Sequence, residues 1–454
     1  MLWLVALCAC GRINFDVRGD GADAIATPTT PWTRFFTSSG RTWIKRVAIG
    51  PDGAVVATGQ FAGAVDIDGR VQPAIGPIDM IVAKFAVDGS YAWSQRYGGT
   101  AAVDGRDIGF DSTGRVYVHG LNSGTATFGT MQQSAGTGQD AIVLRHDASG
   151  MLERTGAFIS TGANAQGRGL SVAPDGRAIA SGSYEGSVVI GSSTLNDKPG
   201  MAAYVAGLDP SGGVSWVSDF SATSRVAAND VDLADGLATA CTAGDFAGTA
   251  DFNGTMRTSA GLQDGFVAGL SSSGATQWAA QIASAGTDFG TGVVATANGD
   301  CIVVGYASTN VDFGAGPVIN AGSLDVFIAR YGPGGTLRWA RLVGGAGDDG
   351  AFAVDEADDG AILVGGGFVG SATFLGEPLT AAGLTDGFLL VLEADGSLRS
   401  VRAFGGTGDE VIYGVAFDHA RRAVAIGGEF MGDTVIDGVT KSGMLGSFIY
   451  WAPY

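Results

Sequence analysis

Basic residues and histidines are scarce in this sequence. Lys and Arg together number 26 against 45 Asp and Glu, so the formal net charge of the 454 residues is −19. A protein that binds nucleic acid needs a basic stripe to neutralise phosphates, and no such stripe is visible. We therefore expect no nucleic-acid partner.

Recognisable catalytic motifs are missing as well. The three histidines, His119, His146 and His419, lie in different sequence contexts, and we interpret them as structural or solvated. The sequence has no His-Glu-x-x-His zinc motif, no nucleophile elbow between a strand and a helix, and no glycine loop leading into a lysine. These absences favour a protein without enzymatic chemistry.

Proline and helical periodicity are also lacking. There are 12 Pro but 76 Gly, without a Gly-X-Y period, which excludes collagen and a Pro-rich disordered chain. No window shows a sustained 3.6-residue period, so we expect no helices. The hydrophobic content of 46% suffices for a sizeable core, and a glycine-rich chain with β-branched residues suits many short strands joined by tight turns.

The one long apolar run lies at the N-terminus and is too short to cross a membrane. Its end, Leu7-Cys8-Ala9-Cys10, resembles the bacterial lipobox, although no Lys or Arg precedes the run. The resemblance implies a signal peptide over residues 1–9, a lipid on Cys10 and a flexible tether over residues 10–31. Several acyl chains would anchor the protein stably at the outer membrane or cell surface; secretion without an anchor is the alternative.

A unit of about 61 residues recurs seven times, and several markers keep the same register. An Ile or Phe returns in steps of 61 or 62 residues, at Ile67, Phe128, Ile190, Phe252, Phe313, Phe374 and Ile436. A tryptophan marks five units and is replaced by Arg154 and Ser400 in the other two; it stands at Trp32, Trp93, Trp216, Trp278 and Trp339. A glycine series has the same period, at Gly59, Gly120, Gly182, Gly244, Gly305, Gly366 and Gly427.

Each unit contains four short apolar or alternating runs separated by Asp-Gly-type turns, the pattern of a four-stranded antiparallel meander. Seven such units predict an all-β, seven-bladed β-propeller over residues 32–454, with one long loop in each blade. WD40 units are shorter, and their Trp-Asp and Gly-His markers are absent here.

The unit resembles the bacterial seven-bladed β-propeller repeat of the SBBP type. Matching stretches are Asp325-Val-Phe327, Gly344-Gly-Ala-Gly-Asp348, Gly405-Gly-Thr-Gly-Asp409 and Val116-Tyr-Val-His-Gly120. The similarity covers Trp32 to Tyr454, and the third and fourth repeats depart most from the pattern. It implies the propeller fold in an exported protein and no particular activity.

The ends of the repeat region predict how the ring closes. The last repeat stops at Phe448–Tyr454, where a third strand belongs, while Trp32–Phe36 has the sequence of an outer strand. We therefore expect Trp32–Phe36 to pair beside the last strand and complete the seventh blade. Cys241 and Cys301 fall on second strands of neighbouring blades, out of step along the strand, so we expect two buried free thiols rather than a disulfide.

Aspartates recur in two sets of loops that open on the same face of a propeller. Their repetition predicts a negative ring at the central channel that could attract Ca²⁺ or a cationic partner; the alternative is that each carboxylate accepts backbone hydrogen bonds within its own turn. The predicted cation ring consists of Asp104, Asp288, Asp348 and Asp409, with Asp230, Asp349 and Glu410 nearby in these loops. The second set is Asp79, Asp140, Asp264, Asp325 and Asp386. No other cofactor is indicated.

Two function classes remain open. The first is a non-catalytic binding or scaffold module, monomeric and exposed at the cell surface, for an unknown protein, glycan or matrix ligand. The second is an extracytoplasmic hydrolase or lyase that uses carboxylates on the acidic loop face. Unique polar residues in the loops of one repeat would favour the enzyme, whereas a repeated Asp favours the binding module.

Overall fold

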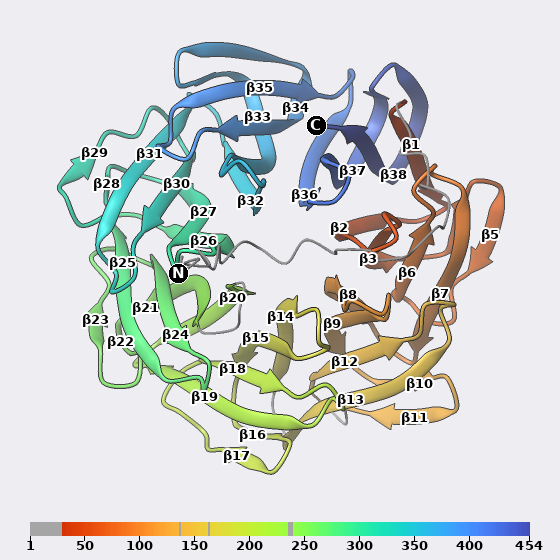
Figure 1. The fold of residues 1–454 in the computed structure, drawn as a ribbon, viewed down its shortest axis with the longest axis horizontal. Helices are drawn as coiled ribbons and strands as arrows, with labels where there is room; N and C mark the ends of the chain where they lie inside the picture. Colours follow the sequence, from red (N-terminus) through yellow and green to blue (C-terminus); the bar gives the residue numbers. More distant parts are fainter. Residues whose placement is uncertain (1–29, 136–137, 162–163, 235–238) are drawn as a thin grey trace, which may run out of the picture.

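The computed structural model describes residues 30–135, 138–161, 164–234 and 239–454. They form antiparallel sheets arranged radially around a central axis, a propeller-like all-β fold (Figure 1). No helix in these ranges is long and apolar enough to span a membrane.

Each repeat contributes a four-stranded meander that runs outward from the axis. The inner strands are β2 (Thr42–Ile49), β8 (Val103–Phe110), β14 (Ala165–Val172), β20 (Arg225–Leu233), β26 (Asp288–Ala295), β32 (Gly350–Glu356) and β36 (Asp409–Asp418). The second strands are β3 (Val55–Phe61), β9 (Val116–Asn122), β15 (Ala178–Tyr184), β21 (Thr239–Ala247), β27 (Cys301–Ala307), β33 (Ile362–Phe374) and β37 (Ala423–Ile436).

The outer half of each meander completes the sheet. The third strands are β6 (Asp79–Phe85), β12 (Asp140–His146), β18 (Ala202–Leu208), β24 (Asp264–Ser271), β30 (Asp325–Tyr331), β34 (Glu377–Leu392) and β38 (Val439–Pro453). The outer strands are β7 (Tyr91–Gly99), β13 (Leu152–Thr161), β19 (Val214–Ala222), β25 (Thr276–Ser284), β31 (Leu337–Gly345), β35 (Leu398–Phe404) and β1 (Trp32–Ser38).

The long loop between the second and third strands is not irregular, as expected, but folds into a hairpin. This hairpin pairs with the outer strand of the preceding repeat, for example β4 with β1 and β10 with β7, so most sheets have six strands. The separate hairpins are β4 (Ala64–Ile67) with β5 (Arg70–Pro73), β10 (Thr125–Phe128) with β11 (Met131–Ser134), β16 (Ser187–Ile190) with β17 (Ser193–Leu195), β22 (Thr249–Asp251) with β23 (Met256–Thr258), and β28 (Val311–Asp312) with β29 (Pro317–Val318). In the last two repeats the hairpin continues from the long strands β33, β34, β37 and β38, and β33 and β34 join two meanders into one eight-stranded sheet.

The hairpin explains the periodic Ile or Phe, because this side chain ends the first hairpin strand and is buried; Ile67 and Phe128 are 0% and 1% exposed. Within the described ranges, the core consists of seven clusters of buried apolar side chains, each shared by two neighbouring repeats. One of them packs Trp32, Phe36 and Trp451 against Ile44 and Ile81, which belong to the first repeat.

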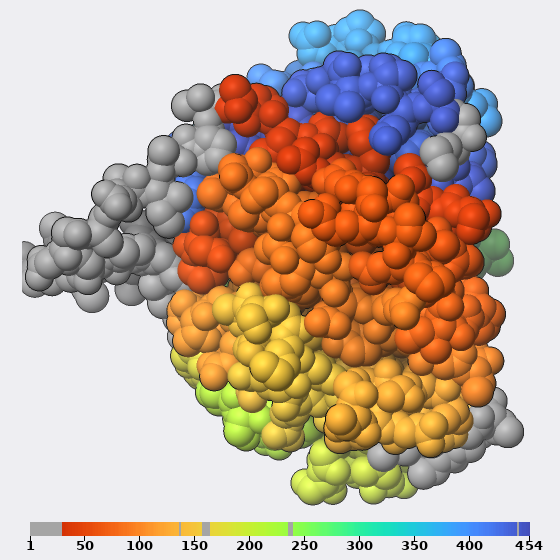
Figure 2. All heavy atoms as spheres, turned by 90° about the vertical axis from the view of Figure 1, so that its right-hand side faces the viewer, coloured from red at the N-terminus to blue at the C-terminus, as the bar shows by residue number. Residues whose placement is uncertain are grey.

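The N-terminal strand lies where the sequence predicted it. β1 pairs antiparallel with β38, Trp32 opposite Trp451, and the two indoles stack with ring centroids 6.3 Å apart. In the side view the red N-terminal residues lie against the blue C-terminal ones (Figure 2).

The periodic tryptophan packs on a glycine in the turn of the next repeat. Trp32 lies against Gly89, whose φ is +78°, and a Cβ there would be 2.7 Å from the indole. Glycine is required for both the left-handed backbone and the close approach. The same contact joins Trp93 to Gly150, Trp216 to Gly274, Trp278 to Gly335, and Trp339 to Gly396.

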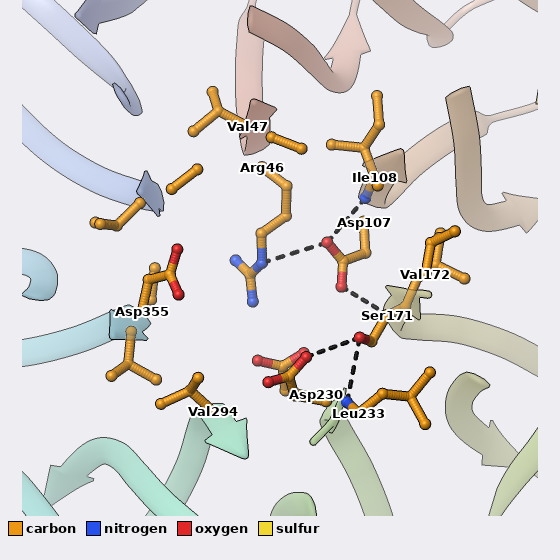
Figure 3. Close-up of a pocket in the computed structure, with 18 of the residues that line it drawn as sticks. Arg46, Val47, Asp107, Ile108, Ser171, Val172, Asp230, Leu233, Val294 and Asp355 are labelled. Carbon is orange, nitrogen blue, oxygen red and sulfur yellow. Dashed lines mark hydrogen bonds and ion pairs between the residues drawn. The ribbon is translucent and has the colours of Figure 1, made fainter. Parts of the chain in front are cut away.

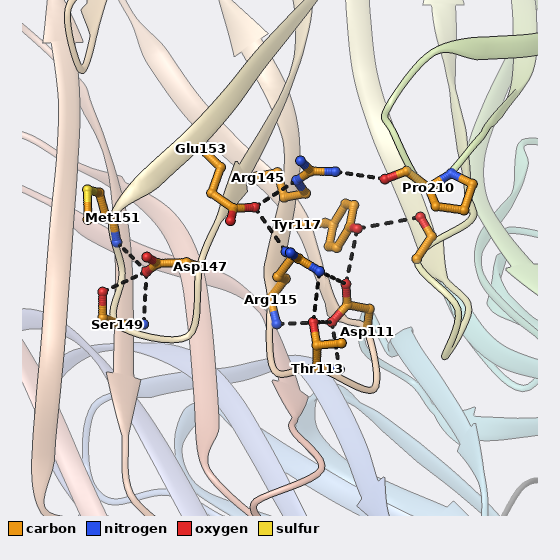
Figure 4. A network of polar contacts seen from close by, with 11 residues as sticks. Asp111, Thr113, Arg115, Tyr117, Arg145, Asp147, Ser149, Met151, Glu153 and Pro210 are labelled. Atoms are coloured by element: carbon orange, nitrogen blue, oxygen red, sulfur yellow. Dashed lines mark hydrogen bonds and ion pairs between the residues drawn. The ribbon is translucent and has the colours of Figure 1, made fainter.

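The predicted Asp-Gly-type turns are present and are held by side-chain hydrogen bonds. Asp147 Oδ1 accepts the backbone N–H groups of Ser149 and Met151, both at 2.9 Å (Figure 4). Beside this turn, Arg145 donates to the carbonyl of Pro210 at 2.8 Å and so connects the second repeat to the third.

The expectation of free thiols is wrong, since Cys241 and Cys301 form a disulfide with Cα atoms 5.8 Å apart. Cys241 is three residues before Gly244 and Cys301 is four residues before the equivalent Gly305, a difference of one position. Successive strand residues point to opposite faces, so this offset turns the two thiols toward each other from facing sheets. The positions of the two cysteines were compared by their distance from the periodic tryptophans. That distance is misleading because the repeats differ in length.

Candidate functional site

Each inner strand carries a β-bulge at an equivalent place. The pairing between inner and second strand shifts there, for example between Ile44 and Arg46 and between Gly290 and Gly292. A bulge leaves one residue unpaired and re-aims its side chain. The residues released, which we call the bulge ring, are Lys45, Arg106, Arg168, Asn229, Thr291, Phe352 and Tyr413.

All members of the bulge ring line one cavity of about 420 Å³, the channel mouth. The rest of its wall consists of Trp43, Arg46, Arg225, Asp245, Phe289 and Tyr306. Side chains from every repeat therefore converge on one hollow, and they differ in chemistry from repeat to repeat.

The early repeats make the mouth basic. Five cationic side chains line it, against the single carboxylate of Asp245. Lys45 Nζ lies 2.6 Å from Asp104 Oδ2, and Arg106 Nε approaches the same oxygen at 2.6 Å. Burial lowers the pKa of Lys45 to about 8, although Asp104 opposes this shift. In a chain of net charge −19, this is a local reversal of sign.

Arg168 has only neutral hydrogen-bond partners among the described residues. It donates to Asn229 Oδ1 and Gln166 Oε1, both at 3.1 Å, and to Ser183 Oγ at 3.3 Å. Burial, followed by the nearby Arg106, lowers its pKa to about 10. A half-buried arginine without an ion pair strongly favours the approach of an anion.

Repeats five to seven, together with Trp43 of the first repeat, make the rest of the wall aromatic. Phe289, Tyr306, Phe352, Tyr413 and Trp43 form a continuous series, which we call the aromatic crescent. Successive ring centroids are 5.2, 6.3, 5.0 and 5.2 Å apart. All five side chains are half-buried, so the crescent presents ring surface to the cavity.

Some polar atoms around the mouth have no hydrogen-bond partner among the described residues. Trp43 Nε1 and Arg225 Nε donate to nothing, and Asp245 Oδ2 accepts nothing, although Arg225 Nη2 lies 3.0 Å from it. Leaving a buried donor or acceptor unsatisfied costs about 1–3 kcal/mol. The mouth is therefore short of both acceptors and donors that a polar ligand could supply.

The other end of the channel, which we call the channel base, is a cavity of about 330 Å³ lined by the same seven inner strands. Val, Ala and Ile recur there, and Arg46 lies between Asp107, Asp230 and Asp355 (Figure 3). Arg46 lines both cavities, so they adjoin.

Aspartates at the base tie each inner strand to a neighbour. Asp107 Oδ2 accepts the N–H of Leu170 at 2.6 Å, Asp230 Oδ2 that of Val293 at 3.0 Å, and Asp355 Oδ2 that of Phe417 at 2.8 Å. Burial raises the pKa of Asp107 to about 7, with Arg46 acting in the opposite direction.

The predicted cation ring does not assemble. Among the described residues, no group of three or more Asp, Glu, His or Cys side chains could hold a metal ion. Asp104 is neutralised by Lys45 and Arg106, while Asp288 is buried and accepts from Ser284 Oγ at 2.8 Å. Asp348 is exposed, and Asp409 accepts the N–H of Thr385 at 3.1 Å.

Two physical reasons account for this correction. The four aspartates are not equivalent in the structure: Asp104 lies one position later in its strand than Asp288, as the pairing with Leu121 and Ala307 shows, so the two side chains point to different faces. Three of the four carboxylates also form ion pairs or hydrogen bonds with nearby groups. The channel mouth, which the sequence predicted to be acidic, is lined mainly by basic side chains.

Four of the five aspartates in the second set serve the turns, as the alternative interpretation held, while Asp140 accepts from Gln133 Nε2. Asp79 accepts the N–H groups of Ile75 and Gly76 at 2.5 and 2.9 Å. Asp264, Asp325 and Asp386 accept equivalent backbone bonds from their own turns.

The histidines have structural partners. His119 contacts the Ile142 carbonyl at 2.8 Å, His146 contacts Tyr97 Oη at 2.6 Å, and burial lowers the pKa of both to about 4. His419 contacts Asp358 at 2.5 Å. Cys10, the predicted lipidation site, lies outside the described residues.

The bulge ring escaped the sequence analysis, although a signal existed. Its members stand 14 or 15 residues before the glycine of the second strand in every repeat. An alignment on that glycine would have exposed one column that changes from basic to aromatic along the chain.

No protein-family model matches this chain, and no curated protein is similar to it in sequence. Among solved structures, Sqt1 from Chaetomium thermophilum aligns over 92% of this chain and 98% of its own, with 8% identity and a TM-score of 0.45. Puromycin hydrolase aligns over 90% and 54%, with 11% identity and a TM-score of 0.44. A Synechocystis apocarotenoid oxygenase variant aligns over 93% of both chains, with 10% identity and a TM-score of 0.41. Since these TM-scores are below 0.5, we base no argument on the likenesses.

Proposed function

We propose that the chain is a seven-bladed β-propeller of SBBP-type repeats, about 61 residues each, closed by β1 as the outer strand of the last blade. Seven interface clusters support this, because the cluster around Trp32 packs the last repeat against the first. The two cavities support it too, since residues of all seven inner strands line each of them.

The propeller acts as a non-catalytic binding module whose site is the channel mouth, and its ligand is anionic. The observation that carries this proposal is the set of five basic side chains around one cavity, with Arg168 lacking an ion pair among the described residues. Concentrated positive charge in a partly desolvated hollow attracts anions far more strongly than dispersed surface charge does.

The alternative, a hydrolase or lyase acting through carboxylates, has weaker support. Burial raises the pKa of Asp349 to about 6 and that of Glu410 to about 7, values that suit acid-base chemistry. Both side chains, however, accept hydrogen bonds from backbone N–H groups of nearby turns, those of Gly345 and Gly406. Their geometry favours a structural role.

The protein works outside the cytoplasm, as a monomer attached to the cell envelope through Cys10 or secreted, with a protein, glycan or matrix component as partner. The cross-repeat disulfide supports this location, since disulfides persist in oxidising compartments. Palmitate labelling in a Gram-negative host should be lost in Cys10→Ala; labelling that persists in the variant would contradict the anchor.

Inorganic pyrophosphate is a compact probe of the binding site. A ligand that prefers the folded state raises the melting temperature, so pyrophosphate should stabilise the protein, and Arg168→Gln should abolish the effect. The matched control is Arg177→Gln, which removes an exposed arginine whose one ion pair among the described residues is with Asp175. If pyrophosphate has no effect on the parent, or stabilises Arg168→Gln equally, the anion site at the mouth is refuted.

A further inference from the structure

The channel mouth has two chemically different walls that face a common space. We infer that its ligand is an oligosaccharide of pyranose sugars that carries a carboxylate, an inference that rests on the proposed anion site. The acid group lies against Arg168 and Arg225, and the sugar ring lies on the aromatic crescent.

The basic wall suits a carboxylate. A guanidinium group presents a planar fork of donors that matches a carboxylate in a bidentate way. Arg168 has no carboxylate partner among the described residues, and Arg225 Nε has no hydrogen-bond partner there. Arg106 also lines the cavity near Arg168, although it is ion-paired with Asp104.

The aromatic wall suits a ring with one apolar face. Phe352 and Tyr413 are members of the bulge ring, with centroids 5.0 Å apart and tilted by 46°. Their half-buried rings offer apolar surface beside water. A compact inorganic anion would not use this surface, whereas the C–H face of a pyranose would bury against it.

Hydroxyl-binding groups lie between the two walls. Asn229 and Thr291 occupy adjacent positions of the bulge ring, and Asp245 lies beside them with Oδ2 free of hydrogen bonds among the described residues. A sugar hydroxyl can donate to this oxygen, whereas an anionic group cannot, so the acid group of the ligand lies at Arg168 and a hydroxyl lies at Asp245. Asp245 therefore favours a ligand that carries hydroxyl groups beside its acid group.

The hollow continues beyond a single sugar. A second cavity of about 310 Å³ shares Tyr306 and Phe352 with the mouth, and its lining includes Asp348 and Asp349, which suit sugar hydroxyls rather than a second acid group. Together the cavities fall within the roughly 300–1,000 Å³ of typical ligand sites. An extended ligand with its acidic end at the arginines fills both.

Calorimetric titration with digalacturonate, its neutral counterpart galactobiose and pyrophosphate tests the inference. Digalacturonate should bind at least tenfold more tightly than galactobiose. Phe352→Ala should weaken digalacturonate at least tenfold and leave pyrophosphate unchanged, and Phe352→Trp should restore binding. Arg168→Gln should weaken both acids.

Three results would overturn the inference while the anion site survives: equal binding of galactobiose, no effect of Phe352→Ala on digalacturonate, or tighter binding of adenosine monophosphate than of digalacturonate. Failure of pyrophosphate to bind the parent would instead refute the proposed function. Circular dichroism of each variant, with Phe417→Ala at the channel base as a control aromatic substitution, separates loss of the site from loss of the fold.

Discussion

The channel mouth and the channel base are built by the same seven inner strands, yet their side chains obey different rules. At the base, small apolar residues recur, and the carboxylates of Asp107, Asp230 and Asp355 each accept a backbone N–H from a neighbouring repeat. At the mouth, the residue released by each bulge is basic in the first three repeats, polar in the next two and aromatic in the last two.

The contrast follows from what each position must do. A base residue serves strand packing, which is the same problem in every repeat, so the solution recurs. A bulged residue takes no part in the ladder, and its side chain can change without disturbing its neighbours. The repeat thus supplies a framework, and the bulges are the places where a site can be differentiated on it.

Removal of β1, the N-terminal strand that pairs with β38, has the largest expected effect on stability. Deletion of residues 10–29 should leave the melting temperature unchanged, whereas deletion through Ser38 should remove β1 and cause aggregation or a large loss of stability. Trp32 alone buries on the order of 200 Å², about 5 kcal/mol at 25 cal/mol per Å². Thermal melting of both truncations would contradict this account if they behaved alike.

The disulfide holds the fourth and fifth repeats together, and these repeats supply Asn229 and Thr291. Its loop spans 60 residues, so Cys241→Ala with Cys301→Ala should cost about 2–4 kcal/mol of unfolding free energy. Denaturant titration under oxidising conditions measures this loss, and the same double variant in reductant should differ little from the reduced parent. Two thiols that react fully with a thiol reagent in the native parent would show that the bond does not form.

A substitution confined to the base should separate stability from binding. In Asp355→Ala the N–H of Phe417 loses its acceptor, which should lower the unfolding free energy by about 1–3 kcal/mol. Pyrophosphate affinity should stay within twofold of the parent. Asp348→Ala, which replaces an exposed aspartate, is the control and should leave the unfolding free energy and the pyrophosphate affinity unchanged. A large loss of pyrophosphate affinity in Asp355→Ala would contradict the view that the base serves stability and the mouth serves binding.

The smallest effect is a pH dependence at the loop that leads into β26. Burial raises the pKa of Asp288 to about 7, above its unfolded value of about 3.9. Between these values the folded state holds a proton that the unfolded state has lost, so stability falls as pH rises toward 7. Asp288→Asn should melt a few degrees above the parent at pH 8, and this difference should shrink to about a third at pH 5, because most of the window between the two pKa values lies above pH 5. A constant difference across this range would contradict the assignment.

The boundaries of the repeats could be predicted from the sequence because the marker residues are required by packing within each repeat and against its neighbour. The tryptophan needs its glycine partner, and the periodic Ile or Phe fills the core at the end of a hairpin strand. The pairing of Trp32 with β38 followed from a count of strands. The hairpins themselves were missed, since two to four residues of alternating pattern resemble a loop.

The candidate site could not be predicted from the sequence in the same way. Aspartates that recur drew attention to Asp104 and Asp288, but recurrence indicates a structural task, and their partners lie in other strands. The bulge shifts the register by one residue, and one residue decides which face a side chain takes. The disulfide was concealed by a different cause, since the distance from the tryptophan to the second strand varies between repeats. The positions proposed to bind ligand are those that differ from repeat to repeat, so a search for repeated residues passes over them.

A crystal structure with digalacturonate bound tests the central claim most directly. We predict ligand density in the channel mouth, with a carboxylate beside Arg168 and a sugar ring on Phe352 and Tyr413, and an unchanged channel base. Density confined to the base or the outer rim, or an empty mouth at a saturating ligand concentration, would contradict the account.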